Sequence, residues 1–165
     1  ALGSAVAMLG SYSFFNCTHL TSLEIPRSVG RINEGAFYAC TGLSGVFFQG
    51  TPPGFGPDLF GGGTPATVYR LPGTDGWGTT YAGRPVVLWN PTLQSSSPDF
   101  GPAPDGFRLP LTGTPDIPIS VNAAARLNAL LWTPLYRGVL TNGAMTVIDP
   151  DWSSIPSRFY RVGPP

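Results

Sequence analysis

The chain has 165 residues, of which 42% are hydrophobic and 11% are charged, and nine basic residues balance nine acidic ones. Because no basic cluster is present, the composition argues against binding to nucleic acid or to anionic membranes. No run approaches the roughly 18 apolar residues that a spanning helix needs, so no membrane insertion is expected. The chain holds 22 Gly and 19 Pro beside its many apolar residues, which predicts an all-β protein with many tight turns.

The most regular feature of the chain is a spacing of 23 residues that joins Phe14, Phe37 and Phe60. The same spacing aligns Leu9 with Ile32 and Phe55, Leu23 with Val46 and Tyr69, and Ile25 with Phe48 and Leu71. A fixed period of this length is typical of stacked structural units. We therefore predict a mainly β fold in which residues 1–89 form a short solenoid of about two and a half repeats with a C-terminal cap.

Residues 9–31 and 32–54 form the two complete units, each with an aromatic turn followed by a short alternating strand. The third unit, 55–77, is degraded by three consecutive glycines. Residues 77–89 are interpreted as the cap, because a terminal repeat must shield the open end of the stack. Residues 1–8 already follow the repeat, and we interpret the N-terminus as the cut end of a longer array.

Two cysteines, Cys17 and Cys40, occupy the same position in successive units. They are expected to lie about 4.8 Å apart, one strand spacing, which is within reach of a disulfide. Two buried free thiols that pack as small hydrophobic groups are the favoured alternative.

The rest of the chain does not follow the spacing of 23 residues. Residues 90–106 are rich in Pro and Ser and are interpreted as a semi-rigid linker. Residues 107–165 are expected to form a small antiparallel β-sandwich, and the dipeptide Asn142-Gly143 indicates a hairpin turn within it. The candidate strands are 107–112, 117–122, 132–135, 138–141, 144–148 and 158–162.

Both complete units follow a pattern close to I-x-x-x-A-F-x-x-C-x-x-L-x-x-I-x-I-P. The matching residues are Leu9, Phe14, Cys17, Leu20, Leu23, Ile25 and Pro26, then Ile32, Ala36, Phe37, Cys40, Leu43, Val46 and Phe48. The pattern resembles the bacterial surface-antigen type of leucine-rich repeat over residues 5–50 and, less closely, over 51–72. This resemblance implies a curved solenoid in a surface or secreted protein that binds other proteins or host cells.

The C-terminal part carries a second pattern, W-x-x-L, F-x-D-P and R-F-Y-R. The residues that match it are Trp132, Leu135, Asp149, Pro150, Arg158, Phe159, Tyr160 and Arg161. It resembles a C-terminal module of predicted secreted proteins from planctomycete- and verrucomicrobia-like bacteria. The resemblance implies a β-sandwich appendage or sorting domain without a known activity.

Residues with catalytic chemistry are few. His19 is the single histidine and lies in a repeat turn, where exposure and an inert role are expected. Asp149-Pro150-Asp151 offers too few oxygens for calcium, which takes six to eight ligands. No motif for a metal, a phosphate or a nucleophile is present, so we expect no catalytic residue, no metal and no cofactor.

A possible interaction surface lies on the outer face of the repeat strands. Glu24, Phe47 and Arg70 share one repeat position and are expected to lie side by side. An acid, an aromatic ring and a base suit a protein interface, although an ordinary solvated face remains open. Four aromatic residues fall out of phase with the inward set and are expected to be partly exposed: Tyr12, Phe15, Tyr38 and Phe47.

These observations predict a non-enzymatic, extracellular or cell-surface module for protein binding or adhesion. The first alternative is a structural subunit of an extracellular filament or coat, in which open repeat ends and strand edges pair between chains. The second is a carbohydrate-binding accessory domain of a secreted hydrolase. A protein partner or self-association is expected, a glycan is possible, and nucleic acid is not.

Overall fold

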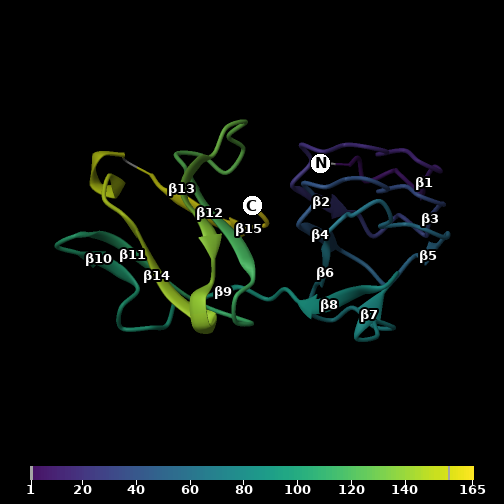
Figure 1. Ribbon diagram of the computed structural model, residues 1–165. Coiled ribbons are helices and arrows are strands. Elements are labelled where there is room, and N and C mark those ends of the chain that lie inside the picture. The colour runs from purple at the N-terminus through teal and green to yellow at the C-terminus, as the bar shows by residue number, and fades with distance from the viewer. Residues whose placement is uncertain (1, 156) are drawn as a thin grey trace. The chain divides into compact units, whose positions relative to one another are not determined.

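The computed structural model describes residues 2–155 and 157–165 (Figure 1). The chain divides into two compact units, residues 1–89 and 90–165. The described residues form strands and two short 3-10 turns but no α-helix. The expected mainly β class is therefore confirmed.

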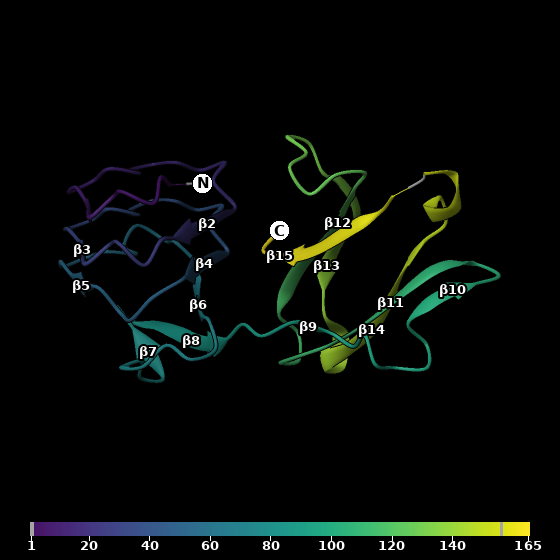
Figure 2. The ribbon, with the colours of Figure 1, turned by 180° about the vertical axis from the view of Figure 1, so that it is seen from behind.

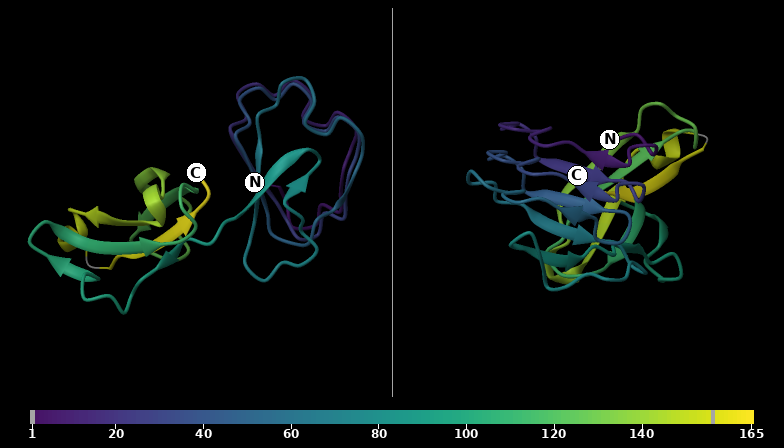
Figure 3. Two further views of the ribbon diagram at one scale, coloured as in Figure 1. Left: turned by 60° about the horizontal axis from the view of Figure 1, so that its bottom comes forward. Right: turned by 90° about the vertical axis from the view of Figure 1, so that its right-hand side faces the viewer.

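Two parallel sheets build the first unit. One has the order β1 (Met8–Leu9), β3 (Arg31–Ile32) and β5 (Gly54–Phe55). The other has the order β2 (Ser22–Ile25), β4 (Gly45–Phe48), β6 (Thr67–Arg70) and β8 (Arg84–Leu88), with β7 (Thr80–Tyr81) antiparallel to β8. Each of the first three coils contributes one strand to each sheet, whereas β7 and β8 both belong to the second sheet. In the left view of Figure 3 the outlines of successive coils lie over one another.

A ladder of phenylalanine rings runs through the core between the two sheets. Phe14 and Phe37 stack with centroids 5.4 Å apart, and Phe37 and Phe60 stack at 5.6 Å. Phe37 is completely buried and Phe60 is 3% exposed. The spacing of 23 residues therefore marks one coil, and the predicted inward position of these rings is confirmed.

Backbone geometry repeats along with the side chains. A left-handed residue recurs at Tyr12, Gly35 and Asp58, with φ between 50° and 56°. A second one recurs at Asn16, Ala39 and Gly62, with φ between 57° and 63°. This conformation is unfavourable for residues with a Cβ, so the surrounding structure must hold it in place. Hydrogen bonds between coils provide that support, and the amides of Tyr12, Phe14 and Asn16 donate to the carbonyls of Glu34, Ala36 and Tyr38.

The backbone carbonyl of each phenylalanine in the ladder accepts a hydrogen bond from a side chain of the following coil. The Cys40 thiol lies 2.9 Å from the Phe14 oxygen, and the Thr64 hydroxyl lies 2.7 Å from the Phe37 oxygen. In the last coil Nη2 of Arg84 donates to the Phe60 oxygen at 2.9 Å. The Phe14 and Phe37 oxygens also accept backbone amide hydrogen bonds from Cys17 and Cys40, so the side-chain donor is a second partner that links one coil to the next.

Both cysteines are free thiols. Cys40 is fully buried and Cys17 is half-buried, in agreement with the alternative of unpaired thiols. Burial raises the pKa of the Cys40 thiol above its usual value, although a backbone hydrogen bond at Cys17 partly opposes this. Cys40 is therefore a protonated hydrogen-bond donor under ordinary conditions.

The third coil departs from the predicted alignment. Val46 pairs with Val68 instead of Tyr69, and Phe48 pairs with Arg70 instead of Leu71. The turn that contains the three glycines is one residue longer than the equivalent turn of the coil before it. The contact from Thr64 to the Phe37 oxygen spans 27 residues, whereas the contact from Cys40 to the Phe14 oxygen spans 26. The following segment is shorter, and the net result is a shift of one residue in β6.

An aromatic cluster closes the last coil. Tyr81 is buried and packs edge-on against Phe48 at 5.3 Å and against Phe55 at 4.8 Å. Trp77 contacts Phe48 at 5.0 Å, and its indole nitrogen donates to the Gly50 oxygen at 3.2 Å. The Tyr81 hydroxyl donates to the Pro53 oxygen. The segment between Trp77 and β8 therefore covers the end of the phenylalanine-lined core.

The second unit contains two antiparallel sheets (Figure 2). One has the order β10 (Gly101–Ala103), β11 (Gly106–Thr112) and β14 (Ala144–Asp149), and β9 (Thr92–Leu93) also pairs with β11. The other has the order β13 (Thr133–Val139), β12 (Pro118–Ala124) and β15 (Phe159–Gly163). Both sheets supply buried apolar residues, among them Leu109, Leu111, Ile119 and Val121.

Three details of this unit differ from expectation. The segment 90–106, predicted as a linker, contains β9 and β10, which pair with β11. The predicted strand 138–141 is not separate, because its first residues belong to β13. Asn142 has the expected positive φ of 54° and lies in the turn η1 (Thr141–Gly143). That turn connects β13 and β14, which belong to different sheets, so the prediction of a hairpin was wrong.

Candidate functional site

The structure separates the three residues of the predicted interaction row. Glu24 pairs with Phe47 as expected, but the next residue in that row is Tyr69. Arg70 lies one position further along and pairs with Phe48. The prediction of one row was therefore wrong for Arg70, because the third coil is shifted by one residue.

Phe47 is also less accessible than predicted. Its side chain is 2% exposed, since Tyr69 stacks on it at 4.7 Å and Trp89 contacts it edge-on at 5.8 Å. Beside it, Glu24 accepts a hydrogen bond of 3.0 Å from the Gln49 amide. The expected partial exposure of Phe47 was wrong, and this part of the strand face is a packed aromatic cluster.

A second group of aromatic side chains is accessible, and we call it the aromatic turn row: Tyr12, Phe15 and Tyr38. Phe15 is 54% exposed and Tyr12 is 46% exposed, as the sequence predicted. Phe15 stacks on Tyr38 at 5.9 Å with an interplanar angle of 19°, and Tyr12 contacts Phe15 edge-on at 6.0 Å. The three rings therefore form one continuous apolar strip across the turns of two coils.

The aromatic turn row is held on a fixed backbone. Tyr12 has positive φ, and its amide and that of Asn16 donate to carbonyls of the next coil. The Tyr12 hydroxyl donates to Glu34 at 3.1 Å, and this hydrogen bond to a carboxylate raises the pKa of Tyr12 above its usual value. Tyr38 lies over glycine backbone, where a Cβ on Gly61 would come within 2.6 Å of the ring. Rings held in this way lose little conformational entropy when a partner binds.

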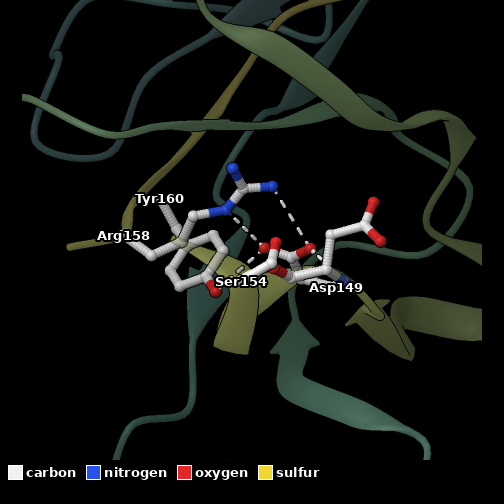
Figure 4. A network of polar contacts seen from close by, with 5 residues as sticks. Asp149, Ser154, Arg158 and Tyr160 are labelled. Atoms are coloured by element: carbon white, nitrogen blue, oxygen red, sulfur yellow. Dashed lines mark hydrogen bonds and ion pairs between the residues drawn. The ribbon is translucent and has the colours of Figure 1, made fainter. Parts of the chain in front are cut away.

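The second unit contains a buried polar network centred on Asp149 at the end of β14 (Figure 4). Nε of Arg158 lies 2.6 Å from Oδ2 of Asp149, and Nη2 lies 3.2 Å from Oδ1. The Tyr160 hydroxyl donates to Oδ2 at 3.1 Å, and the amide of Asp151 donates to Oδ1. Asp149 is fully buried and the Arg158 side chain is 12% exposed.

The charges in this network compensate each other. The bidentate contact with Asp149 raises the pKa of the Arg158 guanidinium above its usual value. Burial, followed by the nearby Asp149 charge, raises the pKa of Tyr160 to about 12, so its hydroxyl remains a donor. Because Asp149 lies on β14 and Tyr160 on β15, the network joins the two sheets of the unit. The sequence pattern named these residues but did not reveal their mutual contact.

The remaining candidates are His19 and any group of side chains that could bind a metal. His19 is exposed, and its Nδ1 lies 3.3 Å from the Thr18 hydroxyl. Within residues 2–155 and 157–165 no three His, Cys, Asp or Glu side chains gather as metal ligands would. The same residues include no helix whose length and apolar character would let it cross a membrane.

Comparison with known proteins agrees with the repeat geometry. Residues 1–72 match the family model described as a BspA type leucine rich repeat region. Searches of curated proteins and of solved structures gave no match. The matched residues contain the aromatic turn row and the phenylalanine ladder.

Proposed function

We propose that the chain is a non-enzymatic module of an extracellular or cell-surface protein, and that its first unit is a short solenoid that binds another protein. The match of residues 1–72 to a BspA type leucine rich repeat region supports this, because such repeats usually present a surface for binding. The observation that carries the proposal is the aromatic turn row, in which Tyr12 and Phe15 are exposed and the backbone is held by hydrogen bonds between coils.

The chemistry of the aromatic turn row fits a protein partner. Tyr and Phe are enriched in the centres of protein interfaces, where they bury large areas at low entropic cost. Glu34 adds a hydrogen-bond acceptor at the edge of the strip through its contact with Tyr12. This surface replaces the row that the sequence indicated on the strand face, where Phe47 is covered.

The test is a binding comparison with matched variants of the full chain. Wild type and a Phe15→Ala/Tyr38→Ala variant would be immobilised and exposed to surface proteins of neighbouring cells, with bound proteins identified by mass spectrometry. Met8→Ala is the control, because Met8 is 56% exposed on β1 and lies outside the row. We expect a partner that wild type and the control retain and the double variant loses. Equal retention by the wild type and both variants would contradict the proposal.

The extracellular location needs its own measurement. Intact producing cells would be treated with a protease, and the cells and the medium would be assayed for the chain. We expect the chain either to be degraded at the cell surface or to be present in the medium. Protection until the cells are lysed would contradict this part of the proposal.

A further inference from the structure

A cleft of about 470 Å³ opens in the second unit beside the Asp149 network. Its lining comes from β11, from the turn η2 (Trp152–Ser154) and from β15 with the residues before it. The lining residues are Phe107, Trp152, Ser153, Ile155, Arg158 and Tyr160. The volume lies within the range of small-molecule sites.

Aromatic rings form much of the cleft wall. Phe107 stacks on Tyr160 at 5.4 Å, and Trp152 is tilted against Phe107 at 5.6 Å. All three side chains are only half-buried, so each ring presents part of its surface to the cleft. An electron-rich ring face attracts polarised C–H groups, which line one side of a pyranose ring.

Arg158 supplies a fixed polar donor in the same cleft. Its Nε and Nη2 are occupied by Asp149, and Figure 4 shows the other terminal nitrogen with no contact to the residues drawn. No partner for Nη1 lies among residues 2–155 and 157–165, and the Arg158 side chain is 12% exposed, which leaves Nη1 as the donor available to a ligand. The bidentate contact holds the guanidinium plane, and a donor fixed in advance costs little entropy on binding.

The charge of the cleft restricts the ligand further. Arg158 is the one permanently charged residue of the lining, and the buried carboxylate of Asp149 compensates it. A phosphate, a sulfate or a carboxylate would therefore meet little uncompensated positive charge. A neutral ligand with an apolar ring face and hydroxyl acceptors matches the wall of rings and the single donor.

We propose that this cleft binds a neutral hexopyranose unit of a glycan. The apolar face of the sugar packs on the Trp152 indole, and a ring hydroxyl accepts a hydrogen bond from Nη1 of Arg158. This site is separate from the aromatic turn row and does not depend on the function proposed for it. It gives the second unit a ligand of its own.

The test uses the full chain and three neutral probes: cellohexaose, laminarihexaose and mannohexaose. At least one is expected to bind with a dissociation constant on the order of 0.1–1 mM, a range accessible to calorimetry. Trp152→Ala should weaken that binding at least about tenfold. Trp132→Ala is the matched control, because Trp132 lies in the same unit under Arg161 and outside the cleft. It should leave binding unchanged.

A measurement on wild type keeps the test independent of whether the variants fold. In a nuclear magnetic resonance titration the indole signal of Trp152 should move with added sugar, and that of Trp132 should stay in place. The proposal is overturned if none of the three probes binds at millimolar concentration. It is overturned equally if binding leaves the Trp152 signal unmoved, or if only an acidic probe, trigalacturonate, is bound.

Discussion

Removing the ring of Phe37 tests the phenylalanine ladder most directly. Phe37 is completely buried between Phe14 and Phe60, at 5.4 and 5.6 Å. Truncating a core Phe to Ala costs about 3–5 kcal/mol, and the cost increases when neighbours cannot close the cavity. Hydrogen bonds between coils fix the backbone on both sides, so we expect Phe37→Ala to lower the free energy of unfolding by about 4–5 kcal/mol.

The matched control is Phe15→Ala, which removes the same ring from an exposed position. Phe15 is 54% exposed and contacts only the surface rings of Tyr38 and Tyr12, so the expected loss is about 1 kcal/mol. Because the two compact units can unfold separately, the assay is native-state hydrogen exchange read separately for amides of β4 and β12. Phe37→Ala should lower protection in β4 and leave β12 unchanged.

Two results would refute the reasoning. One is a change of less than about 1 kcal/mol in β4 for Phe37→Ala, which would mean that the ring does not fill the core. The other is an equal effect of Phe15→Ala, which would mean that burial and register do not distinguish the two rings.

Three further expectations concern ionisable groups. Asp149→Asn should destabilise the second unit by about 3–5 kcal/mol, read from exchange in β12, because Arg158 loses its buried counter-charge. The pKa of Tyr160 is raised to about 12 in the folded chain, against about 10 in the unfolded chain. The protonated hydroxyl therefore contributes to the free energy of unfolding, and this contribution is fully present below about pH 10. This contribution should be lost as the pH rises from about 10 through 12. Ultraviolet absorbance should then show one tyrosine, Tyr160, ionising at higher pH than an ordinary tyrosine, and ionisation of Tyr160 near pH 10 would contradict the prediction. The Cys40 thiol, buried and bonded to a carbonyl, should react with a thiol reagent far more slowly than the half-buried Cys17 in the native chain; equal native rates would argue against its burial.

The repeat spacing predicted the first two coils well. Leu9, Ile32 and Phe55 pair across β1, β3 and β5, and the three ladder rings stack in the order expected. A spacing is reliable where no residue is inserted, because each coil then places equivalent residues directly over one another.

The same reasoning failed where the chain gained and lost residues inside one coil. The glycine-rich turn lengthens the path to Thr64, and the following segment shortens it, so a fixed period misplaced Tyr69 and Arg70 by one. Glycine tolerates many backbone conformations, and the sequence therefore does not reveal where the register changes.

Burial on the strand face could not be predicted from the repeat either. Phe47 is covered by Tyr69 and Trp89, and Trp89 comes from the segment after the repeats. In the second unit the strands lie near the predicted ranges, but the one predicted hairpin, at Asn142-Gly143, does not form. The contact of Asp149 with Arg158 links a strand end to a residue nine positions later, and only the fold brings their charges together.

The side chains that donate to the carbonyls of the phenylalanine ladder affect how repeats of this kind can be recognised in a sequence. A thiol, a hydroxyl and a guanidinium donate to the carbonyls of Phe14, Phe37 and Phe60. These three residue types are not similar, so a sequence comparison does not recognise them as equivalent. The family match ends at residue 72, yet parallel pairing continues through β8 to Leu88. This coil forms beyond the matched residues, and its Arg84 guanidinium takes the place that a thiol and a hydroxyl take in the coils before it. Detection of such degenerate coils should therefore score hydrogen-bonding capacity at that turn and not cysteine alone.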